Sequence, residues 1–343
     1  MIKKTKGPKI YVVLPVFNRL KFTKQCLSSL KKQKYKNFTV IIIDDGSTDG
    51  TGEYIAKKYP EWQVIKGTGQ WWWTRSMYEG VSLALQSAKK GDFVLEMNND
   101  CYFNPGYLSQ LIKTSKKYPN SIIGSTCVIA NRPTKIVEIG IRIDWPTGIV
   151  YAVAKSISDK LSYYKNMDIV DDIDALPGKG TLIPVKTFKR AGNFDYKKLP
   201  HYIADYEFSI RAKRNGFNLI VDTKAIVKHH WNATGISSKK QNEIKSYKKA
   251  WQLLFGRKSM NNIIDWLTFV LIACPKEYIL INLYFTLLRL GKAVFSVYPL
   301  YYLKPIFQLI VNVYHYVRYY KLTFYRLYLK IKQFPEYHLR RKA

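Results

Sequence analysis

The stretch TVIIIDDGSTDG at residues 39–50 joins an apolar run to an acidic turn, and this junction decides the fold. The run at 39–43 is rich in β-branched residues, which is typical of a buried strand. IYVVL (10–14) and DFVLEM (92–97) have a similar apolar character, and residues at helical spacing lie between the three runs. Strands that alternate with helices predict an α/β fold with a doubly wound, mostly parallel, Rossmann-like sheet.

Acidic and amide side chains follow two of these strands. Asp44 and Asp45 begin the turn after the strand at 39–43, and Asn98-Asn99-Asp100 follows the strand at 92–97. Ligands of such sheets bind beyond the carboxyl ends of the strands, so we expect a functional site there. Carboxylates can accept hydrogen bonds from ribose hydroxyls or hold Mg²⁺ or Mn²⁺. Each motif alone is also explained by turn formation or helix capping.

Three further motifs carry candidate functional residues. Asp205-Tyr206-Glu207 begins an expected helix at 205–214, where its two carboxylates point in different directions and one can serve as a general base. His229-His230 follows the strand-like AIVK and can bind a metal or a phosphate, although a structural histidine pair is the alternative. Three consecutive tryptophans at 71–73 cannot all share one core face, and Arg75 beside them can pair with phosphate oxygens.

Composition narrows the class of protein. The 343 residues include 56 Lys and Arg against 24 Asp and Glu, a formal net charge of +32, and 47% hydrophobic residues argue against a disordered chain. The apolar run near the N-terminus is only about eight residues long and contains Pro15, so we interpret it as a strand rather than a signal peptide. The four cysteines show no paired spacing, which argues against a disulfide scaffold or a thiolate zinc site and favours a reduced, cytosolic compartment: Cys26, Cys101, Cys127 and Cys274.

The last third of the chain differs from the rest. Residues 236–343 carry 19 Lys and Arg against 4 Asp and Glu, mixed with many Tyr, Phe, Leu and Ile. Their apolar stretches are shorter than the ~20 residues that cross a bilayer: 266–275, 278–288, 293–303 and 305–317. We therefore predict helices that lie in the interface of an anionic membrane, with an ordinary helical subdomain or an oligomer contact as the alternative and a spanning pair as the less favoured one.

The order of the motifs is more specific than any one of them. Together they resemble family-2 glycosyltransferases of the GT-A fold over roughly residues 8–235, and they are most similar to bacterial polysaccharide and rhamnosyltransferase-like members. The motifs are VVLPVFNR (12–19), DDGSTDG (44–50), GTGQWWWTRSMYEG (67–80), EMNND (96–100), LPGKGTLIP (176–184), LPHYIADYEF (199–208) and VKHHWNAT (227–234). The resemblance implies a nucleotide-sugar-binding catalytic domain at 1–235. The composition predicts that a basic, aromatic-rich helical region follows at 236–343, as a membrane interface or an oligomer contact.

The resemblance also implies three groups of site residues. Contacts to the nucleotide-sugar donor would come from Pro15, Asn18, Asp44, Asp45, Arg75 and Asn98. Asp100 and His229, with His230 as the alternative, would hold Mn²⁺ or Mg²⁺. Asp205 would take the proton of the acceptor hydroxyl, and the acceptor side would be supported by Glu207, Gly180 and Trp73.

Three positions depart from the family's pattern. Asn98 stands where the family has the first aspartate of Asp-x-Asp, which leaves Asp100 as the main acidic metal ligand. Ala204 precedes Asp205 where many members have Glu, and Tyr78 stands where Asn is frequent. The base therefore has one carboxylate neighbour fewer, and Tyr78 supports no assignment to the donor.

The implied reaction is sugar transfer from a UDP- or dTDP-sugar to a hydroxyl of a glycan or a polyprenyl-diphosphate-linked acceptor, in bacterial-type surface polysaccharide synthesis. A diphosphate leaving group needs a cation, and a single base suits one inverting displacement. The expected location is cytoplasmic, peripheral at the inner face of the cell membrane, with the oligomeric state open and no nucleic acid as partner.

Three alternatives stay open. One is a catalytically silent assembly protein of the same fold, which the intact Asp100 and Asp205 argue against. Another is a nucleic-acid-binding protein, but the chain has no helix-turn-helix, zinc-finger or RNP pattern. A nucleotidyltransferase would want a Gly-rich basic loop near the N-terminus, and LPVFNR lacks one.

Overall fold

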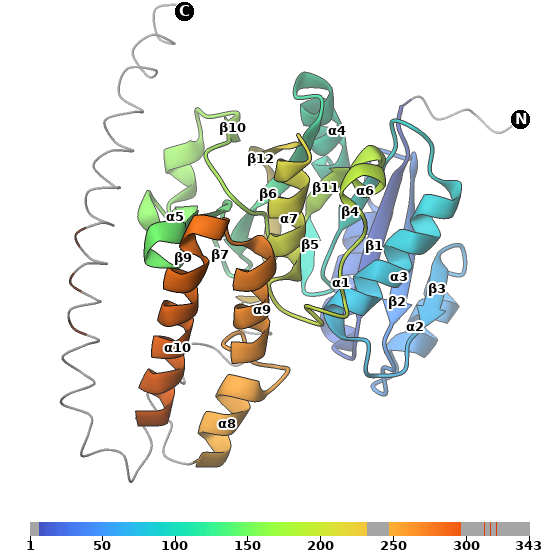
Figure 1. Ribbon diagram of the computed structural model, residues 1–343. Helices are drawn as coiled ribbons and strands as arrows, with labels where there is room; N and C mark the ends of the chain where they lie inside the picture. The colour runs from blue at the N-terminus through green and yellow to red at the C-terminus, as the bar shows by residue number, and fades with distance from the viewer. Residues whose placement is uncertain (1–6, 232–246, 296–311, 313–315, 317–319, 321–343) are drawn as a thin grey trace, which may run out of the picture.

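A mixed sheet of ten strands forms the centre of the protein in the computed structural model, which describes residues 7–231 and 247–295 together with Asn312, Tyr316 and Tyr320 (Figure 1). Eight strands run in the order β10 (Ile169–Val170), β12 (Asn218–His229), β6 (Ser121–Ile129), β11 (Thr181–Pro184), β4 (Phe93–Glu96), β1 (Ile10–Val16), β2 (Phe38–Asp44) and β3 (Gln63–Lys66). β5 (Cys101–Phe103) pairs with β12, and β7 (Arg132–Glu138) pairs with β6.

Strand direction places the predicted site residues at one edge of the sheet. β4, β1, β2 and β3 are mutually parallel, and β6 is parallel to β12. β11 is antiparallel to both β4 and β6, so these two strands point the same way. The ends of β2, β4 and β12 therefore lie on the same side, and the predicted mostly parallel α/β sheet is confirmed.

Helices cover both faces of the sheet, and the alternation of side chains along β1 shows why. Tyr11 and Val13 belong to one buried cluster with α3 (Trp72–Ser87), α6 (Val185–Ala191) and α7 (Ala204–Arg214). Val12 and Leu14 belong to the cluster on the other face, with α1 (Leu20–Lys31), α2 (Thr51–Lys58) and α4 (Tyr107–Lys117). Apolar residues on both sides of a strand are what a sheet buried on both faces requires.

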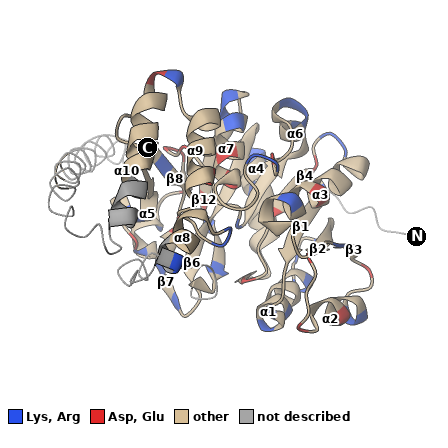
Figure 2. Ribbon diagram, turned by 60° about the horizontal axis from the view of Figure 1, so that its bottom comes forward, with Lys and Arg blue, Asp and Glu red and all other residues tan. Residues whose placement is uncertain are grey.

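Lys and Arg positions are spread over several helices around the sheet, including α1, α4 and α6 (Figure 2). The sequence region from 130 to 200, which is less regular in pattern, contains β7, β10 and β11. It also contains a separate hairpin of β8 (Ile141–Asp144) and β9 (Ile149–Ala152). The short helix α5 (Val153–Ser156) follows β9.

The helices after residue 246 pack against the end of the sheet opposite α2 and β3 (Figure 1). They are α8 (Tyr247–Phe255), α9 (Ile263–Ala273) and α10 (Ile279–Phe295). Phe269 and Ala273 of α9 share a buried cluster with Ala204 and Ile210 of α7, and Arg214 donates to the carbonyl of Ala273 at 2.5 Å. This packing crosses residue 235, where we predict the boundary between the two regions.

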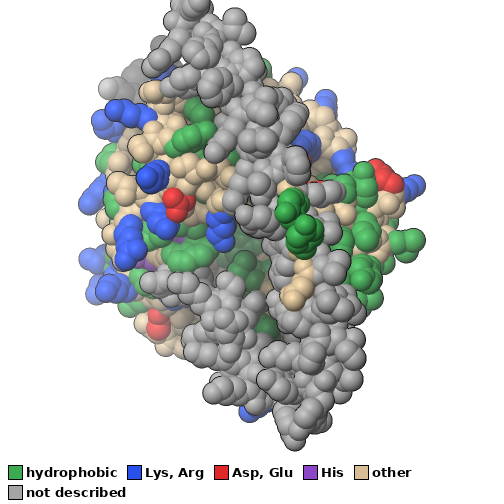
Figure 3. Space-filling model, turned by 90° about the vertical axis from the view of Figure 1, so that its left-hand side faces the viewer, with side chains coloured by type: hydrophobic (Ala, Val, Ile, Leu, Met, Phe, Trp, Pro, Cys, Tyr) green, Lys and Arg blue, Asp and Glu red, His purple; other side chains and the backbone are tan. Residues whose placement is uncertain are grey.

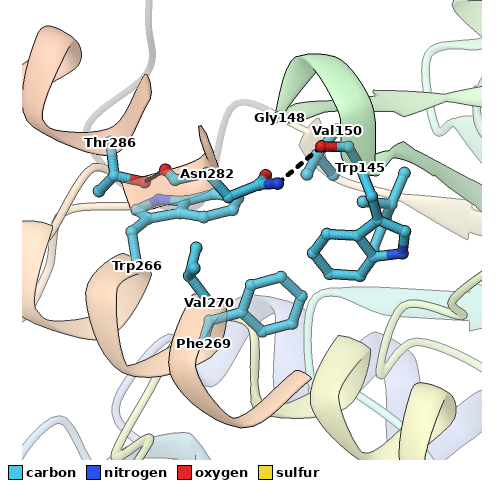
Figure 4. Close-up of a pocket in the computed structure, with 9 residues that line it drawn as sticks. Trp145, Gly148, Val150, Trp266, Phe269, Val270, Asn282 and Thr286 are labelled. Carbon is cyan, nitrogen blue, oxygen red and sulfur yellow. Dashed lines mark hydrogen bonds between the residues drawn. The ribbon is translucent and has the colours of Figure 1, made fainter. Parts of the chain in front are cut away.

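The hairpin β8–β9 meets α10 at a small pocket (Figure 4). Asn282 Nδ2 donates to the Trp145 carbonyl at 2.6 Å across this contact, and Trp266 and Phe269 of α9 line the same pocket. None of the predicted site residues lines it. The pocket is therefore a packing joint between the C-terminal helices and the sheet domain.

α10 continues as one helix through Arg289 and Lys292 to Phe295, so it joins the apolar stretch 278–288 to the start of the stretch 293–303. Within the described parts of the chain, no helix is both long and apolar enough to cross a membrane. The predicted stretches 293–303 and 305–317 lie almost wholly outside the described residues.

Candidate active site

The acidic turn after β2 holds neighbouring backbone in place. Asp44 Oδ1 accepts from the Ser47 N–H at 2.9 Å, and both Asp44 and Asp45 are buried. Asp45 accepts from the N–H groups of Gly69, Trp71 and Trp72 at 2.8, 2.9 and 3.0 Å. Its carboxylate thus caps the start of α3, where unpaired N–H groups and the helix dipole favour a negative charge.

Asn18 connects β1 to the same turn. Its Oδ1 accepts from the Thr48 N–H at 2.8 Å, and its own N–H donates to Ser47 Oγ at 2.8 Å. Pro15, a predicted donor contact like Asn18, lies half-buried in β1 opposite Ile43 of β2. The structure therefore brings the four predicted nucleotide contacts of β1 and β2 to one edge of the sheet.

Asp100 and His229 meet at the ends of β4 and β12. His229 Nε2 lies 3.5 Å from Asp100 Oδ1, and only 2% and 1% of the two side chains are exposed. Among the described residues, neither ring nitrogen of His229 finds a hydrogen-bond partner. A buried imidazole without partners beside a buried carboxylate is a donor set that suits a divalent cation.

The surroundings of Asp100 are cationic. Burial raises the pKa of the Asp100 carboxyl, but the nearby His229, Lys179 and Arg19 outweigh burial and hold the pKa below its usual value. Arg19 Nη1 lies 3.4 Å from Asp100 Oδ2. The ligand atoms of Asp100, Cys101 and His229 all lie within 4.8 Å of one another, yet burial raises the pKa of the Cys101 thiol well above its ordinary value. Asp100 and His229 are therefore the better ligands for Mn²⁺ or Mg²⁺.

His230 has different contacts from its neighbour. Its Nε2 lies 2.8 Å from Gln25 Oε1, and its ring packs against Phe22 and Tyr102 with centroids 4.6 and 5.5 Å away. Its backbone N–H donates to the Asp100 carbonyl at 3.0 Å. The geometry thus favours His229 over His230 as the ligand.

The tryptophan motif bridges the two sides of the site. Trp73 Nε1 donates to Asn98 Oδ1 at 2.9 Å, and the Trp73 N–H donates to His201 Nδ1 at 3.3 Å. Gly178 lies against the Trp73 ring so closely that a Cβ at this position would come within 2.3 Å of it. Trp73 therefore connects the end of β4 to the segment that precedes α7.

Arg75 lies on the outer side of this motif. Its guanidinium group lies 4.9 Å from the Trp71 ring and 5.5 Å from the Tyr196 ring, and its Nε lies 3.6 Å from Glu79 Oε1. The side chain is 43% exposed, which leaves it accessible to a ligand. Stacking of this kind orients the planar guanidinium group.

Asp205 begins α7 on the other side of the site. Its Oδ2 accepts from the Gly178 N–H at 2.8 Å, and its Oδ1 accepts from the Tyr206 N–H at 3.0 Å. Burial raises the pKa of Asp205 to about 6, against the opposing effects of these N–H groups and of Lys179. A carboxylate with this pKa is charged at neutral pH and accepts a proton more readily than an ordinary aspartate.

Glu207 and Gly180 have contacts that support the site from within. Glu207 is buried and pairs with Arg211 through two contacts of 2.7 and 2.8 Å, so it points away from Asp205 as the spacing predicts. Gly180 has φ +77°, and a Cβ there would lie 2.5 Å from the Tyr107 hydroxyl. Only glycine suits both the backbone and the space at this position.

Several residues at the site were missed by the sequence analysis. Glu96, at the end of β4, is 2% exposed, and burial followed by the nearby Asp205 charge raises the pKa of its carboxyl well above the ordinary value. Lys179 forms a 2.7 Å ion pair with Glu138 at the end of β7. Burial lowers the pKa of His201 to about 4, which keeps its ring neutral. Glu96 and Lys179 lie inside motifs that the sequence singles out, but Glu138 carries no local signal.

Residues with strained backbone conformations lie near the candidate site. Among the described residues, five other than glycine have positive φ, and four of them lie at the starts of helices beside the site: Asn18, Arg19, Trp72 and Ile203, with φ of 56°, 65°, 56° and 58°. Ile203 and Trp72 are bulky residues for which this conformation is a genuine outlier. Such strain clusters at functional sites, which agrees with the position of the carboxylates.

Comparison with known proteins agrees with this geometry. The sequence model of glycosyl transferase family 2 matches residues 11–176. This segment of the chain is therefore similar to that family. Its match includes the acidic turn, the tryptophan motif and Asp100, and it ends before the loop that carries Lys179.

Curated relatives carry the same class of name. Glycosyltransferase GlyA of Streptococcus pneumoniae serotype 4 is 30% identical over 122 residues, which cover 33% of this chain and only 16% of the relative. An uncharacterized glycosyltransferase of Rickettsia typhi is 24% identical over 264 residues. This match covers 73% of this chain and 73% of the relative. This chain thus matches one relative locally and another over most of its length.

Solved structures share the fold. Mannosyltransferase PcManGT from Pyrobaculum calidifontis, in complex with GDP-Man and Mn²⁺, has a TM-score of 0.50 at 16% identity, over 85% of this chain and 75% of that one. GalNAc-T7 with UDP, GalNAc and Mn²⁺ has a TM-score of 0.50 at 15% identity, over 76% of this chain and 50% of that one. The chain therefore has the GT-A fold that the resemblance implies.

Proposed function

We propose that this chain is a metal-dependent, inverting glycosyltransferase. It moves a sugar from a UDP- or dTDP-sugar to a hydroxyl of a glycan or polyprenyl-diphosphate-linked acceptor, in the synthesis of a bacterial-type surface polysaccharide. One observation carries the proposal: a buried carboxylate with raised pKa, Asp205, shares one sheet edge with the Asp100–His229 cluster. The two solved structures that share the fold hold a nucleotide or nucleotide sugar with Mn²⁺, which supports the same kind of donor here.

The residues divide the chemistry between them. Asp205 takes the proton of the acceptor hydroxyl while the oxygen forms a bond to the anomeric carbon, and the bond from that carbon to the diphosphate oxygen breaks. Asp100 and His229 would hold the cation, which offsets the negative charge that develops on the diphosphate. Arg19 and Arg75 add positive charge on the same side, and the nucleoside diphosphate leaves with the bonding electrons. Attack opposite the leaving group inverts the anomeric centre.

A thermal-shift series tests the donor site. Purified protein is heated with UDP- and dTDP-sugars, each with Mn²⁺, Mg²⁺ or EDTA, because a ligand that binds only the folded state raises the unfolding midpoint. We expect a rise of several degrees for one nucleotide class with a divalent cation and none with EDTA. Asp100→Ala should abolish the rise, whereas Asp168→Ala, which removes an exposed aspartate paired with Lys117 and Lys224, should keep it.

Two outcomes of the thermal-shift series would contradict the proposed donor site. If no nucleotide sugar raises the midpoint under any metal condition, the donor site does not exist as proposed. If a shift persists in EDTA and in Asp100→Ala, the donor binds without the proposed cation site. Product analysis by NMR of the anomeric proton then decides between inversion and retention for the active donor.

The proposed membrane location rests on α10. Its exposed residues are apolar at helical spacing, with Leu280, Tyr284 and Leu287 exposed to 83%, 49% and 51%, while polar Asn282 and Thr286 are buried. Ile264 and Leu271 of α9 are also exposed, and both hydrophobic and basic side chains lie on the face in Figure 3. A helix with apolar residues outside needs a cover, and the basic composition of residues 236–343 fits an anionic lipid surface.

Vesicle flotation tests this location. Wild-type protein should float with vesicles that contain anionic phosphatidylglycerol and should float less with neutral phosphatidylcholine alone. Leu280→Ser with Leu287→Ser should reduce binding at least severalfold, since each exposed leucine loses its burial in the lipid. Val64→Ser on β3, a matched exposed apolar residue at the other end of the sheet, should not. Wild-type protein that stays unbound but forms dimers broken by the double variant would assign the face to a second copy instead.

A further inference from the structure

A buried ion pair lies beside the proposed base and has no place in the chemistry above. Lys179 Nζ lies 2.7 Å from Glu138 Oε2, and the two side chains are only 15% and 13% exposed. Lys179 comes from the loop before β11, and Glu138 is the last residue of β7. The pair thus joins two segments that meet only in the folded protein.

Stability alone does not account for the pair. Moving two charges out of water costs several kcal/mol per ion, and replacing such a pair by packed apolar residues is often neutral or stabilising. The neighbourhood is already well packed, since Cys127 lies opposite Glu138 in the sheet and is fully buried. The two charges therefore have a further effect on the groups around them.

The loop that carries Lys179 also binds the base. Gly178, its direct neighbour, donates its N–H to Asp205 Oδ2 at 2.8 Å, and Gly180 donates to the Glu96 carbonyl at 2.8 Å. Four titratable groups act on or face Asp205 from the surrounding elements. They are Lys179 from the loop, Glu138 from β7, Glu96 from β4 and Tyr206 from α7 itself.

We propose that Lys179 and Glu138 are positioning residues that tune Asp205: the ammonium group favours the carboxylate form that can accept a proton, and the Glu138 carboxylate limits this effect. The inference rests on the proposed function, because it assumes that Asp205 is the base. It assigns to each charge an effect of opposite sign on the same carboxyl group. A pair too far from Asp205 to act on its carboxyl group would produce no such opposition.

The electrostatics agree with this assignment. Burial is the largest influence on the pKa of Asp205 and raises it, Lys179 lowers it, and Glu138 raises it again. In a site with few exposed groups, these charges are weakly screened. Removing one partner should therefore displace the titration of Asp205 in a direction that depends on which partner is removed.

The experiment measures kcat against pH at saturating donor and Mn²⁺ for three variants. Wild-type kcat should fall on the acid side with an apparent pKa of about 6. Lys179→Met should move this limb to higher pH and Glu138→Gln should move it to lower pH, each by about half a unit or more. Lys179→Arg keeps the charge and should leave the limb near the wild-type position.

A second readout does not need turnover. The ¹³C shift of the Asp205 side-chain carboxyl, assigned with Asp205→Asn, can be titrated in metal-free protein, and it should move in the same two directions. If Lys179→Met does not fold, Glu138→Gln still decides, because its amide oxygen can accept from Lys179 and preserve the contact.

The inference would be overturned if the acid limbs of the kcat profiles of Lys179→Met and Glu138→Gln both stay at the wild-type pH. It would also be overturned if both limbs move in the same direction. The proposed function fails separately, if wild-type protein transfers no sugar or if Asp205→Asn keeps full kcat. The carboxyl titration reports on the ion pair in either case, so the two failures are distinguishable.

Discussion

Asp100 and Asp205 are the same residue type at one edge of the sheet, and their surroundings have opposite effects. Asp100 lies among Arg19, His229 and Lys179, which hold its pKa below the usual value despite burial. Asp205 has two backbone N–H groups as its hydrogen-bond partners, and burial raises its pKa to about 6. One environment keeps a permanent anion that suits a cation, whereas the other keeps a carboxylate that can exchange a proton near neutral pH.

This difference supports the proposed roles more firmly than either residue does alone. Pairs of carboxyl groups whose environments drive their pKa values apart commonly divide electrostatic and proton-transfer work between them. Hydrogen bonds hold the neighbouring backbone on both sides of the site, from the Trp72 N–H to Asp45 at α3 and from the Gly178 N–H to Asp205 at α7. Variants that remove one property at a time test this division of roles.

The largest expected effect is on kcat at the Asp205 end. Asp205→Asn removes the proton acceptor but keeps an oxygen that can accept from the Gly178 N–H, so kcat should fall by roughly 10²- to 10⁴-fold. The thermal shift caused by donor and Mn²⁺ should stay close to wild type, because the donor side is untouched. Steady-state kinetics and the thermal-shift series measure the two quantities on the same preparation.

Asp205→Glu is the matched control for this variant. It restores a carboxylate with one additional methylene group, so it should recover part of the lost rate. An Asp205→Asn enzyme with kcat within a factor of three of wild type would assign the base to another residue. Loss of the donor-induced shift in the same variant would instead place Asp205 on the donor side.

The next largest effect is on the stability of the metal-free protein, where Asp205→Asn and Asp100→Asn should change the free energy of unfolding in opposite directions. At neutral pH the raised pKa of Asp205 means that the folded state binds a proton more tightly than the unfolded state, so the charged carboxylate destabilises the fold. Asp205→Asn should then stabilise metal-free protein by about 1 kcal/mol. Asp100→Asn should destabilise it by about 1–3 kcal/mol, since Arg19 and His229 lose the carboxylate beside them.

Thermal unfolding in EDTA at pH 7.5 measures both variants. Because the stability penalty at Asp205 disappears as pH falls through about 6 towards 4, the advantage of Asp205→Asn should shrink at pH 5. If Asp205→Asn and Asp100→Asn shift the unfolding midpoint in the same direction, the surroundings of the two carboxyl groups do not differ as described.

The sequence predicted the sheet and one half of the site better than the other half. Asp44, Asp100 and His229 follow apolar strands, and parallel strands bring their ends to one edge, so pattern alone places these residues together. The Lys179–Glu138 pair depends on β7 returning beside β6 as an antiparallel hairpin within a region without regular periodicity. A contact between a loop and a distant strand leaves no trace in local spacing.

Two other outcomes depended on details that only packing resolves. The sequence does not distinguish His229 from His230 as a metal ligand. In the structure the His229 ring lies beside Asp100, whereas the His230 ring lies beside Gln25. Asp45 was expected to contact the donor, and its carboxylate is instead surrounded by three N–H groups at the start of α3. Its role in donor binding stays a prediction, now with a capping role beside it.

The smallest expected effect concerns Trp73, which connects Asn98 at the end of β4 to the segment before Asp205. Asn98 accepts from Trp73 Nε1 at 2.9 Å, and the Trp73 N–H donates to His201 in the segment before Asp205. Asn98→Ala leaves the indole N–H without this partner, so it should cost about 1 kcal/mol of stability and reduce kcat/KM severalfold. Asn98→Asp retains an acceptor oxygen and should recover the unfolding midpoint. If Asn98→Ala lowers kcat/KM while its donor-induced thermal shift stays unchanged, Trp73 acts on the acceptor side, because the donor end would then be intact while the segment leading to Asp205 has lost its anchor.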